Sequence, residues 1–210
     1  MIDWSLADAY QNLDMPQLVD TCNGCQACGL AETRTKVVVG SGPSPCPLMI
    51  VGEGPGEQED LSGLPFVGRA GQLLTKILGS VGIDREKDVY IANIVKCRPP
   101  GNRNPEAKEV NACRGYLIRQ IQLVQPKILL LLGAPSLKSF FPDSPSISKV
   151  RGQWMYADVP YSDTQLYIMP IFHPSYLLRQ ASKEPGSPKW LTWSDMKEVK
   201  SALDFVRDFE

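Results

Sequence analysis

Three polar side chains each stand near the end of a separate apolar run in this sequence, and together they could bind and polarise a small ligand. Glu53 follows the first run, Asn93 lies late in the second, and His173, the only histidine, follows the fourth. Ligands in open α/β sheets sit beyond the carboxyl ends of the strands, so we expect the three side chains to converge on one pocket. A polar residue after a strand is also ordinary loop composition, and the pattern alone does not exclude that interpretation.

Four cysteines form a second group with chemical potential. Cys25 and Cys28 make a C-x2-C pair, and Cys97 and Cys113 follow far downstream with fifteen residues between them. Four thiolates are a complete ligand set for a [4Fe–4S] cluster or for structural zinc, and the spacing does not choose between the two. Buried cysteines without a ligand are a third possibility. A site that joins the four would close long loops and tie the amino-terminal segment to the core.

The register of the C-x2-C pair is ambiguous, because Cys22 also forms such a pair with Cys25, while Cys46 stands apart. No signal-peptide pattern occurs within Met1–Tyr10, and no segment has the length needed to cross a bilayer. We therefore expect a cytoplasmic protein. Structural disulfides are uncommon in that reducing compartment, which favours metal binding or burial for the cysteines.

Four short apolar runs are the elements that must position these residues. Continuous apolar runs of this length are typical of strands buried on both faces. The runs are Leu48–Gly52, Val89–Lys96, Ile128–Gly133 and Leu166–Phe172. Helical periodicity covers 72–81 and 106–124, and a final amphipathic helix is expected over about 194–209. The alternation predicts an α/β fold whose central, mainly parallel sheet has four strands joined by crossover helices.

The composition sets bounds on size and partners. With 210 residues and 43% hydrophobic content, the chain can bury one substantial core, and we expect a single domain over residues 1–210. A formal net charge of −1 excludes a polycation that coats nucleic acid. Any contact with DNA must therefore use local basic patches, and composition leaves the partner open.

Four motifs in fixed order resemble the family 4 uracil-DNA glycosylases, the iron–sulfur branch of the uracil-DNA glycosylase superfamily. The segments are CQACGLAETRT, VGEGPGEQEDLSGLPFVGRAG, NIVKCRPPGNRNP and FHPSYLLR, and the match runs from about Cys25 to the carboxyl end. The resemblance implies a three-layer α/β/α fold and hydrolytic release of uracil from single- or double-stranded DNA, the first step of base excision repair. It also implies a [4Fe–4S] cluster, with the ligands Cys25, Cys28, Cys97 and Cys113.

The resemblance assigns the pyrimidine pocket to three residues. Phe66 matches the residue whose ring stacks on the flipped-out base. Asn93 matches the residue that reads uracil, because its amide complements O4 and N3–H, whereas cytosine presents the opposite pattern. His173 matches the electrophile that donates to O2 as negative charge develops on the departing uracil. Each also has a structural interpretation, as a core aromatic, a capping amide or a satisfied histidine.

The glycine-rich loop after the first run is expected to complete the site. Glu53 is the second candidate catalytic residue: it would contact uracil or the attacking water and stabilise positive charge on the sugar. Family 1 members carry an aspartate one residue later, where this chain has Gly54, so the water-activating role is not carried over with the motif. Gly54 and Gly56 would let the backbone approach the flat base, and Gly56 with Glu59 would exclude the methyl group of thymine. The G-x-G-x-G spacing with Pro55 does not fit a dinucleotide-binding loop.

The segment that follows the histidine is expected to contact DNA. Pro174 and Ser175 complete the His-Pro-Ser motif, and Leu178 and Arg179 are candidates for the side chain that fills the gap left by the extruded base. The leucine could instead join the core at the start of a helix. Cations in nearby loops are candidates for phosphate contacts, although solvated surface charge explains any one of them. They are Arg98, Arg103, Lys183 and Lys189.

Two other classes of protein remain open from the sequence. A DNA- or RNA-binding module could keep the fold and the cluster without the chemistry, and a zinc-stabilised α/β protein could share the cysteines alone. A related branch traps DNA covalently through a histidine in a basic insertion after the cluster region. Residues 101–105 read GNRNP here and contain no histidine, so trapping is not expected. The preferred hypothesis is a monomeric glycosylase that acts on uracil-containing DNA and has no association with membranes.

Overall fold

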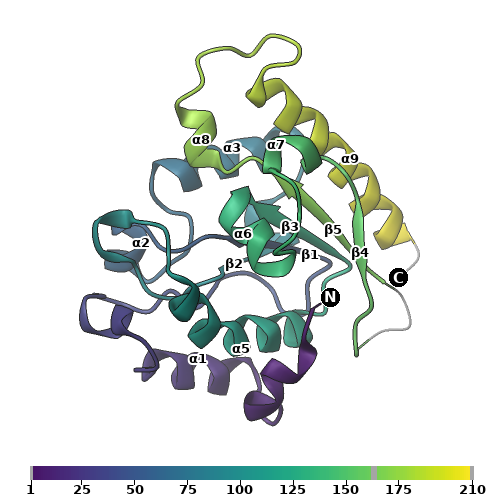
Figure 1. The fold of residues 1–210 in the computed structure, drawn as a ribbon. Coiled ribbons are helices and arrows are strands. Elements are labelled where there is room, and N and C mark those ends of the chain that lie inside the picture. Colours follow the sequence, from purple (N-terminus) through teal and green to yellow (C-terminus); the bar gives the residue numbers. More distant parts are fainter. Residues whose placement is uncertain (1, 162–164, 209–210) are drawn as a thin grey trace.

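A five-stranded sheet forms the centre of the computed structural model, which describes residues 2–161 and 165–208. Four of its strands coincide with the predicted apolar runs: β1 Leu48–Gly52, β2 Val89–Asn93, β3 Ile128–Leu132 and β5 Leu166–Ile171. They lie in the order β2-β1-β3-β5 and are all parallel (Figure 1). Every residue of β1, β2 and β3 is buried, which explains why these runs are continuously apolar.

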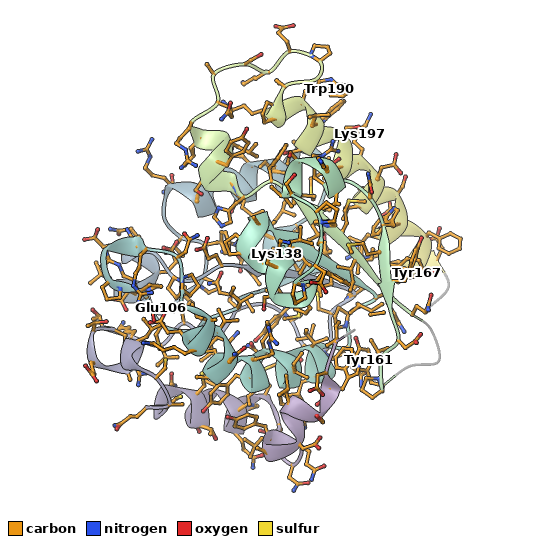
Figure 2. The ribbon with its side chains drawn as sticks, in the orientation of Figure 1. Glu106, Lys138, Tyr161, Tyr167, Trp190 and Lys197 are labelled. Carbon is orange, nitrogen blue, oxygen red and sulfur yellow. The ribbon has the colours of Figure 1, made fainter. Side chains whose placement is uncertain are left out.

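The predicted count of four strands is wrong, because a short edge strand completes the sheet. β4, Met155–Ala157, pairs with β5 in antiparallel orientation and is only partly buried. Its central residue, Tyr156, is exposed and packs edge-to-face on Tyr167 of β5, with ring centroids 5.3 Å apart (Figure 2 labels Tyr167). Its three residues, with Trp154 before them, form an apolar run of only four residues between polar ones, which is too short to identify a strand.

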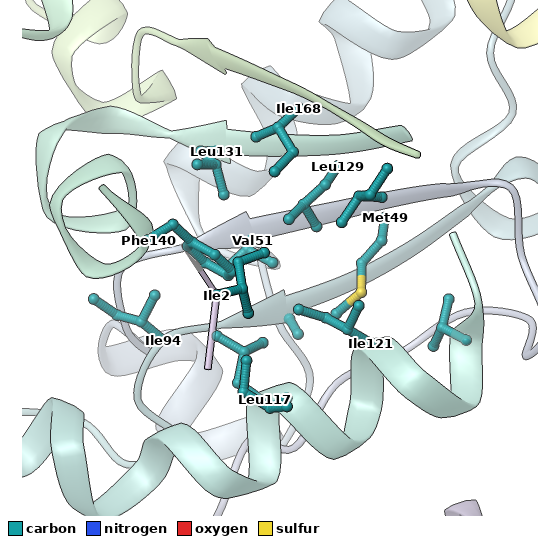
Figure 3. Close-up of a cluster of buried hydrophobic side chains, with 14 of the residues drawn as sticks. Ile2, Met49, Val51, Ile94, Leu117, Ile121, Leu129, Leu131, Phe140 and Ile168 are labelled. Carbon is teal, nitrogen blue, oxygen red and sulfur yellow. The ribbon is translucent and has the colours of Figure 1, made fainter. Parts of the chain in front are cut away.

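One face of the sheet packs on α5, Ala107–Val124. Figure 3 shows Leu117 and Ile121 of this helix beneath the sheet, where they share a buried cluster with Met49 and Val51 of β1. Alternate residues of a strand point to opposite faces. The intervening β1 residues therefore contribute to the core on the other side of the sheet.

The opposite face packs on α3, Arg69–Ser80, and α9, Pro188–Asp208. Helices on both faces confirm the predicted three-layer α/β/α fold. α9 begins several residues before the predicted start, with Pro188 as its first residue. Proline is well suited to that position because the first helical N–H has no partner within the helix.

Shorter helices occupy the connections. They are α1 Met15–Asn23, α2 Glu57–Ser62, α4 Arg85–Asp88, α6 Gly133–Phe140, α7 Ile147–Val150 and α8 Pro174–Leu178, with 3-10 turns at Trp4–Tyr10, Gly29–Glu32 and Pro100–Asn102. α2 and α8 follow the carboxyl ends of β1 and β5, so they lie at the edge of the sheet where ligands are expected. Within the described ranges, no helix combines the length and apolarity needed to cross a membrane.

Candidate active site

A cavity of about 540 Å³ opens at the carboxyl ends of the parallel strands. It brings together the three polar residues of separate apolar runs and the aromatic residue assigned to base stacking. The predicted residues that line it are Glu53, Gly54, Gly56, Glu59, Phe66, Asn93, His173, Ser175 and Arg179. Pro174 and Leu178 do not line it. The parallel topology accounts for this convergence, since it places the ends of β1, β2 and β5 on one side of the sheet.

Asn93 is the last residue of β2, and its side chain is almost fully buried. Within the described part of the chain, its Oδ1 is the one buried side-chain oxygen or nitrogen without a hydrogen-bond partner. An unsatisfied buried acceptor costs roughly 1–3 kcal/mol. A ligand that supplies an N–H donor inside the cavity would recover that free energy.

Gly52 creates the space beside this amide. It lies directly opposite Asn93 in the β1–β2 register. A Cβ atom at this position would lie 2.4 Å from Asn93 Oδ1 and 2.5 Å from the Phe66 ring, closer than non-bonded atoms can approach. Any larger residue would therefore displace these two side chains, both of which line the cavity.

Phe66 lies in the turn between α2 and α3 and adopts a left-handed backbone conformation with φ of 53°. A bulky residue rarely occupies this region, and the strain persists only where the surroundings enforce it. The ring is 6% exposed, and its centroid lies 5.8 Å from that of the His173 ring. The aromatic and imidazole groups therefore form adjoining walls of the cavity.

Two charged side chains hold the Phe66 turn. The guanidinium of Arg85 donates to the carbonyl oxygens of Pro65 and Phe66, both at 2.7 Å. Glu59 Oε1 accepts the next two backbone N–H groups, at 2.8 and 2.7 Å. The carbonyls of Pro65 and Phe66 and the two N–H groups that follow Phe66 are thus all held by these two side chains. Arg85 gives no signal in the sequence, because it stands in a run of charged residues that is typical of a solvated surface.

Glu59 therefore has a structural task that the sequence did not reveal. Its second oxygen, Oε2, accepts the backbone N–H of Gly56 at 3.1 Å, so the carboxylate joins the glycine-rich loop to the Phe66 turn. The predicted exclusion of thymine by Gly56 and Glu59 stays a prediction. Both residues line the cavity, but no contact in the structure identifies the edge of the base that they would face.

His173 caps α8 and is held in one tautomer. Its Nδ1 accepts the backbone N–H of Ser175 at 3.1 Å and lies 2.8 Å from the hydroxyl of the same residue. Burial, with a smaller contribution from the positive charge of Arg179, lowers the pKa of His173 to about 4. The ring is therefore neutral at physiological pH, and its proton resides on Nε2, which has no acceptor among the described residues.

Glu53 directly follows β1 and supplies a carboxylate to the cavity. Burial raises the pKa of the Glu53 carboxyl above its ordinary value. Its side chain makes no hydrogen bond or ion pair with the described residues, in contrast to the fully engaged Glu59. The carboxylate is therefore available to a ligand or to water.

The segment after His173 separates into core and surface positions. Leu177 is buried, whereas Leu178 is 39% exposed, so the second of the two leucines is the one available to DNA. Pro174 is buried as the first residue of α8. Arg179 lines the cavity mouth.

The predicted phosphate contacts do not form one group. Arg103 lines the cavity but makes a two-pronged ion pair with Glu109, at 2.6 and 2.9 Å, and this pair offsets its charge. Arg98 donates to the side chain of Asn102 at 2.7 Å. Lys183 and Lys189 line a separate groove beyond α8.

The cysteines predicted to bind a cluster lie in one region between the amino-terminal segment, the end of β2 and α5. Cys97 and Cys113 are buried in one apolar cluster, and Cys28 packs against it. Cys25 packs on a neighbouring cluster that contains Cys22. All six cysteines are free of disulfides, and among the described residues no three side chains of the kinds that bind metals are gathered as a preformed site.

The donor chemistry of this region nevertheless suits a thiolate-bound cluster. Three of the four predicted ligands meet at one apolar cluster, and Arg34 Nη1 donates to Cys97 Sγ at 3.3 Å. A cationic donor to the sulfur stabilises the thiolate form that binds iron. Cys46 lies apart, and its single S–H has the backbone carbonyls of Asp88 and Leu48 as acceptors, 3.2 and 3.4 Å from Sγ.

Comparison with known proteins assigns a class to this fold and cavity. The family model of the uracil DNA glycosylase superfamily matches residues 39–197. A type-4 uracil-DNA glycosylase of Thermotoga maritima is 50% identical over 188 residues, which cover 87% of this chain and 90% of that protein. A type-4 enzyme of Saccharolobus solfataricus is 41% identical, covering 91% of this chain and 87% of the relative.

The chain therefore belongs to the uracil-DNA glycosylase superfamily and, within it, to the type-4 branch that these relatives represent. This confirms the family expected from the four motifs.

Proposed function

We infer that this protein is a uracil-DNA glycosylase, which hydrolyses the N-glycosidic bond of uracil in DNA and so begins base excision repair. The observation that carries the assignment of its site is the unpartnered, buried Oδ1 of Asn93 inside the cavity. In the proposed complex, Oδ1 accepts N3–H of uracil and the amide nitrogen donates to O4. Cytosine would instead place an acceptor opposite Oδ1 and a donor opposite the amide nitrogen. These buried groups would then be left unpaired.

His173 is proposed to stabilise the departing base. Its neutral ring donates from Nε2 to O2 of uracil, where negative charge develops as the glycosidic bond breaks. The Ser175 N–H to Nδ1 bond supports this role by selecting the tautomer with the proton on Nε2. A donor that strengthens with the developing charge lowers the barrier rather than only tightening ground-state binding.

Glu53 is proposed to act on the sugar side of the bond. Its carboxylate would orient the attacking water and stabilise positive charge on the sugar, with Gly54 and Gly56 bringing the loop backbone close to the nucleotide. The lack of a partner for the Glu53 side chain among the described residues supports this role, as does its raised pKa, which is the expected effect of burial in a catalytic cavity. Phe66 would stack on the base, held in place by its fixed turn.

We propose that Cys25, Cys28, Cys97 and Cys113 hold a [4Fe–4S] cluster. The grouping of three of these cysteines and the Arg34 contact to Cys97 support it. When bound, the cluster supplies a cross-link between the amino-terminal segment and the catalytic fold rather than a step of the reaction. Purified protein should absorb visible light as iron–sulfur proteins do, and a colourless zinc protein would contradict this assignment.

The remaining parts of the proposal concern organisation and location. Glu53, Phe66, Asn93 and His173 already line one cavity, so the site needs no residue from a second copy, and we propose a monomer with a single catalytic domain. Six cysteines free of disulfides and a DNA substrate support action in the reducing cytoplasm.

Incubation with oligonucleotides followed by alkali tests the function. Strand scission is expected at uracil in single- and double-stranded DNA, with none at cytosine or thymine in matched sequences. Tight DNA binding without scission at any base would instead identify a binding module that has lost the chemistry.

A further inference from the structure

A second concave surface lies on the far side of α8 from the active-site cavity. This groove of about 420 Å³ is formed by α3, α8 and the start of α9. Its lining includes Trp190, Trp193 and three lysines, Lys76, Lys183 and Lys189. Figure 2 shows Trp190 near the amino-terminal end of α9.

The aromatic wall of this groove is unusually open to solvent. Trp193 is 42% exposed, although tryptophan normally buries most of its large apolar surface. Lys197 Nζ lies 4.3 Å from the centre of the same ring. An exposed indole beside ammonium groups is the combination that binds a nucleic-acid strand, since a base stacks on the ring while a cation contacts the phosphate.

The charge of the groove is complementary to DNA. No acidic side chain lines it, and Lys76, Lys183 and Lys189 form no ion pair with the described residues. A protein with a net charge of −1 that acts on DNA must use local positive surfaces of this kind. An apolar protein partner would not require three lysines around the aromatic wall.

The groove also lies next to the active site. α3 contributes Ala70 to the catalytic cavity and Ile77 to the groove, while Leu177 backs the groove between two cavity residues, Ser175 and Arg179. A strand that crosses α8 on leaving the cavity would therefore reach the tryptophans.

We propose that the groove of Trp190 and Trp193 is a second DNA-binding site, which holds a single-stranded segment flanking the target nucleotide. The tryptophans stack on unpaired bases, and the surrounding lysines contact the phosphates. The groove adds affinity for single strands without reading sequence, because every base has a stacking face.

Trp193→Ala tests the stacking contact on a probe without uracil, so the result does not depend on catalysis. Affinity for a thymidine oligonucleotide of about 15 nucleotides is expected to fall about tenfold. Phe205→Ala is the matched control, because it removes an exposed aromatic near the other end of the same helix. Circular dichroism and thermal unfolding check that the variant folds.

The lysines are tested by the salt dependence of the same binding reaction. Lys183→Gln with Lys189→Gln should reduce the slope of log affinity against log salt by about 1.4, since each single-strand phosphate contact contributes roughly 0.7. The control double variant, Lys87→Gln with Lys108→Gln, removes two exposed lysines elsewhere.

Activity on long and short substrates gives a third measure. KM for a uracil-containing single strand should be lower than KM for a uracil-containing trinucleotide, and Trp193→Ala should reduce this difference. Unchanged oligonucleotide affinity in a folded Trp193→Ala protein would overturn the proposal. A Trp193→Ala variant that kept its affinity for DNA but lost binding to a second copy of the chain or to a peptide would also overturn the proposal.

Discussion

The two sides of the catalytic cavity are built differently. The recognition side, around Phe66 and Asn93, is fixed by Arg85, by Glu59 and by the space left at Gly52. The leaving-group side, around His173, rests on α8, a helix of five residues whose cap is bonded within its own turn. The contrast suggests that the two sides have different roles. The rigid recognition side selects the base, and the short, partly exposed helix α8 contacts the DNA around the target nucleotide.

The largest expected effect is on the recognition side. Asn93→Ala removes both hydrogen-bonding groups and should lower kcat/KM on uracil by roughly 10³- to 10⁴-fold. The variant should fold, since this side chain satisfies no other group through Oδ1. A single-turnover rate near that of wild type would contradict the assigned role.

Loss of the leaving-group donor should have the next largest effect. His173→Ala should lower kcat by roughly 10²- to 10³-fold, and His173→Gln should recover part of it, because a neutral amide can also donate. These rates are measured under single-turnover conditions. Equal rates for alanine and glutamine would contradict a hydrogen-bonding role.

His173 also predicts a dependence of stability on pH. Its pKa is lowered from 6.5 in the unfolded chain to about 4 in the folded protein. The neutral form is therefore the one compatible with the fold, and the contribution of His173 to stability is complete above pH 6.5 and is lost as pH falls toward 4. Thermal unfolding of His173→Ala should depend less on pH across this window than that of wild type.

A smaller effect on activity is expected when the turn that holds Phe66 loses its contact with Arg85. Arg85→Ala leaves the carbonyls of the Phe66 turn without their donors and should lower kcat/KM on uracil roughly tenfold by misplacing the ring. Affinity for uracil-free DNA should not change, which separates positioning from general damage. Arg69→Ala, an exposed arginine nearby on α3, is the control, and Arg85→Lys should recover only part of the activity because lysine lacks the two-pronged geometry.

The smallest effect is expected on the exposed face of α8. Leu178→Ala should lower activity on double-stranded DNA several-fold and that on single strands less, because a duplex leaves a gap that the side chain would fill. Leu177→Ala should instead destabilise the fold by roughly 2–5 kcal/mol, since that leucine is buried. Equal losses on both substrates for Leu178→Ala would contradict the wedge role.

The sequence predicts most of the sheet because buried parallel strands are continuously apolar, and the bounds of β1 matched its run without change. β4 was not predicted because a half-exposed edge strand of three residues has only a very short apolar run and no long alternation. The site was predicted chiefly through motifs. No pattern foretold the left-handed conformation of Phe66, or the contact from Arg85, which joins α4 to a turn 19 residues earlier in the chain.

The central claim is that the Asn93 amide reads uracil, and NMR of the asparagine side-chain amides measures it most directly. Addition of free uracil should shift the Asn93 Nδ2–H resonances and slow their exchange with water, whereas cytosine at the same concentration should leave them in place. Asn93→Ala identifies the resonance by its absence. Resonances that ignore uracil, or that respond equally to cytosine, would contradict the account.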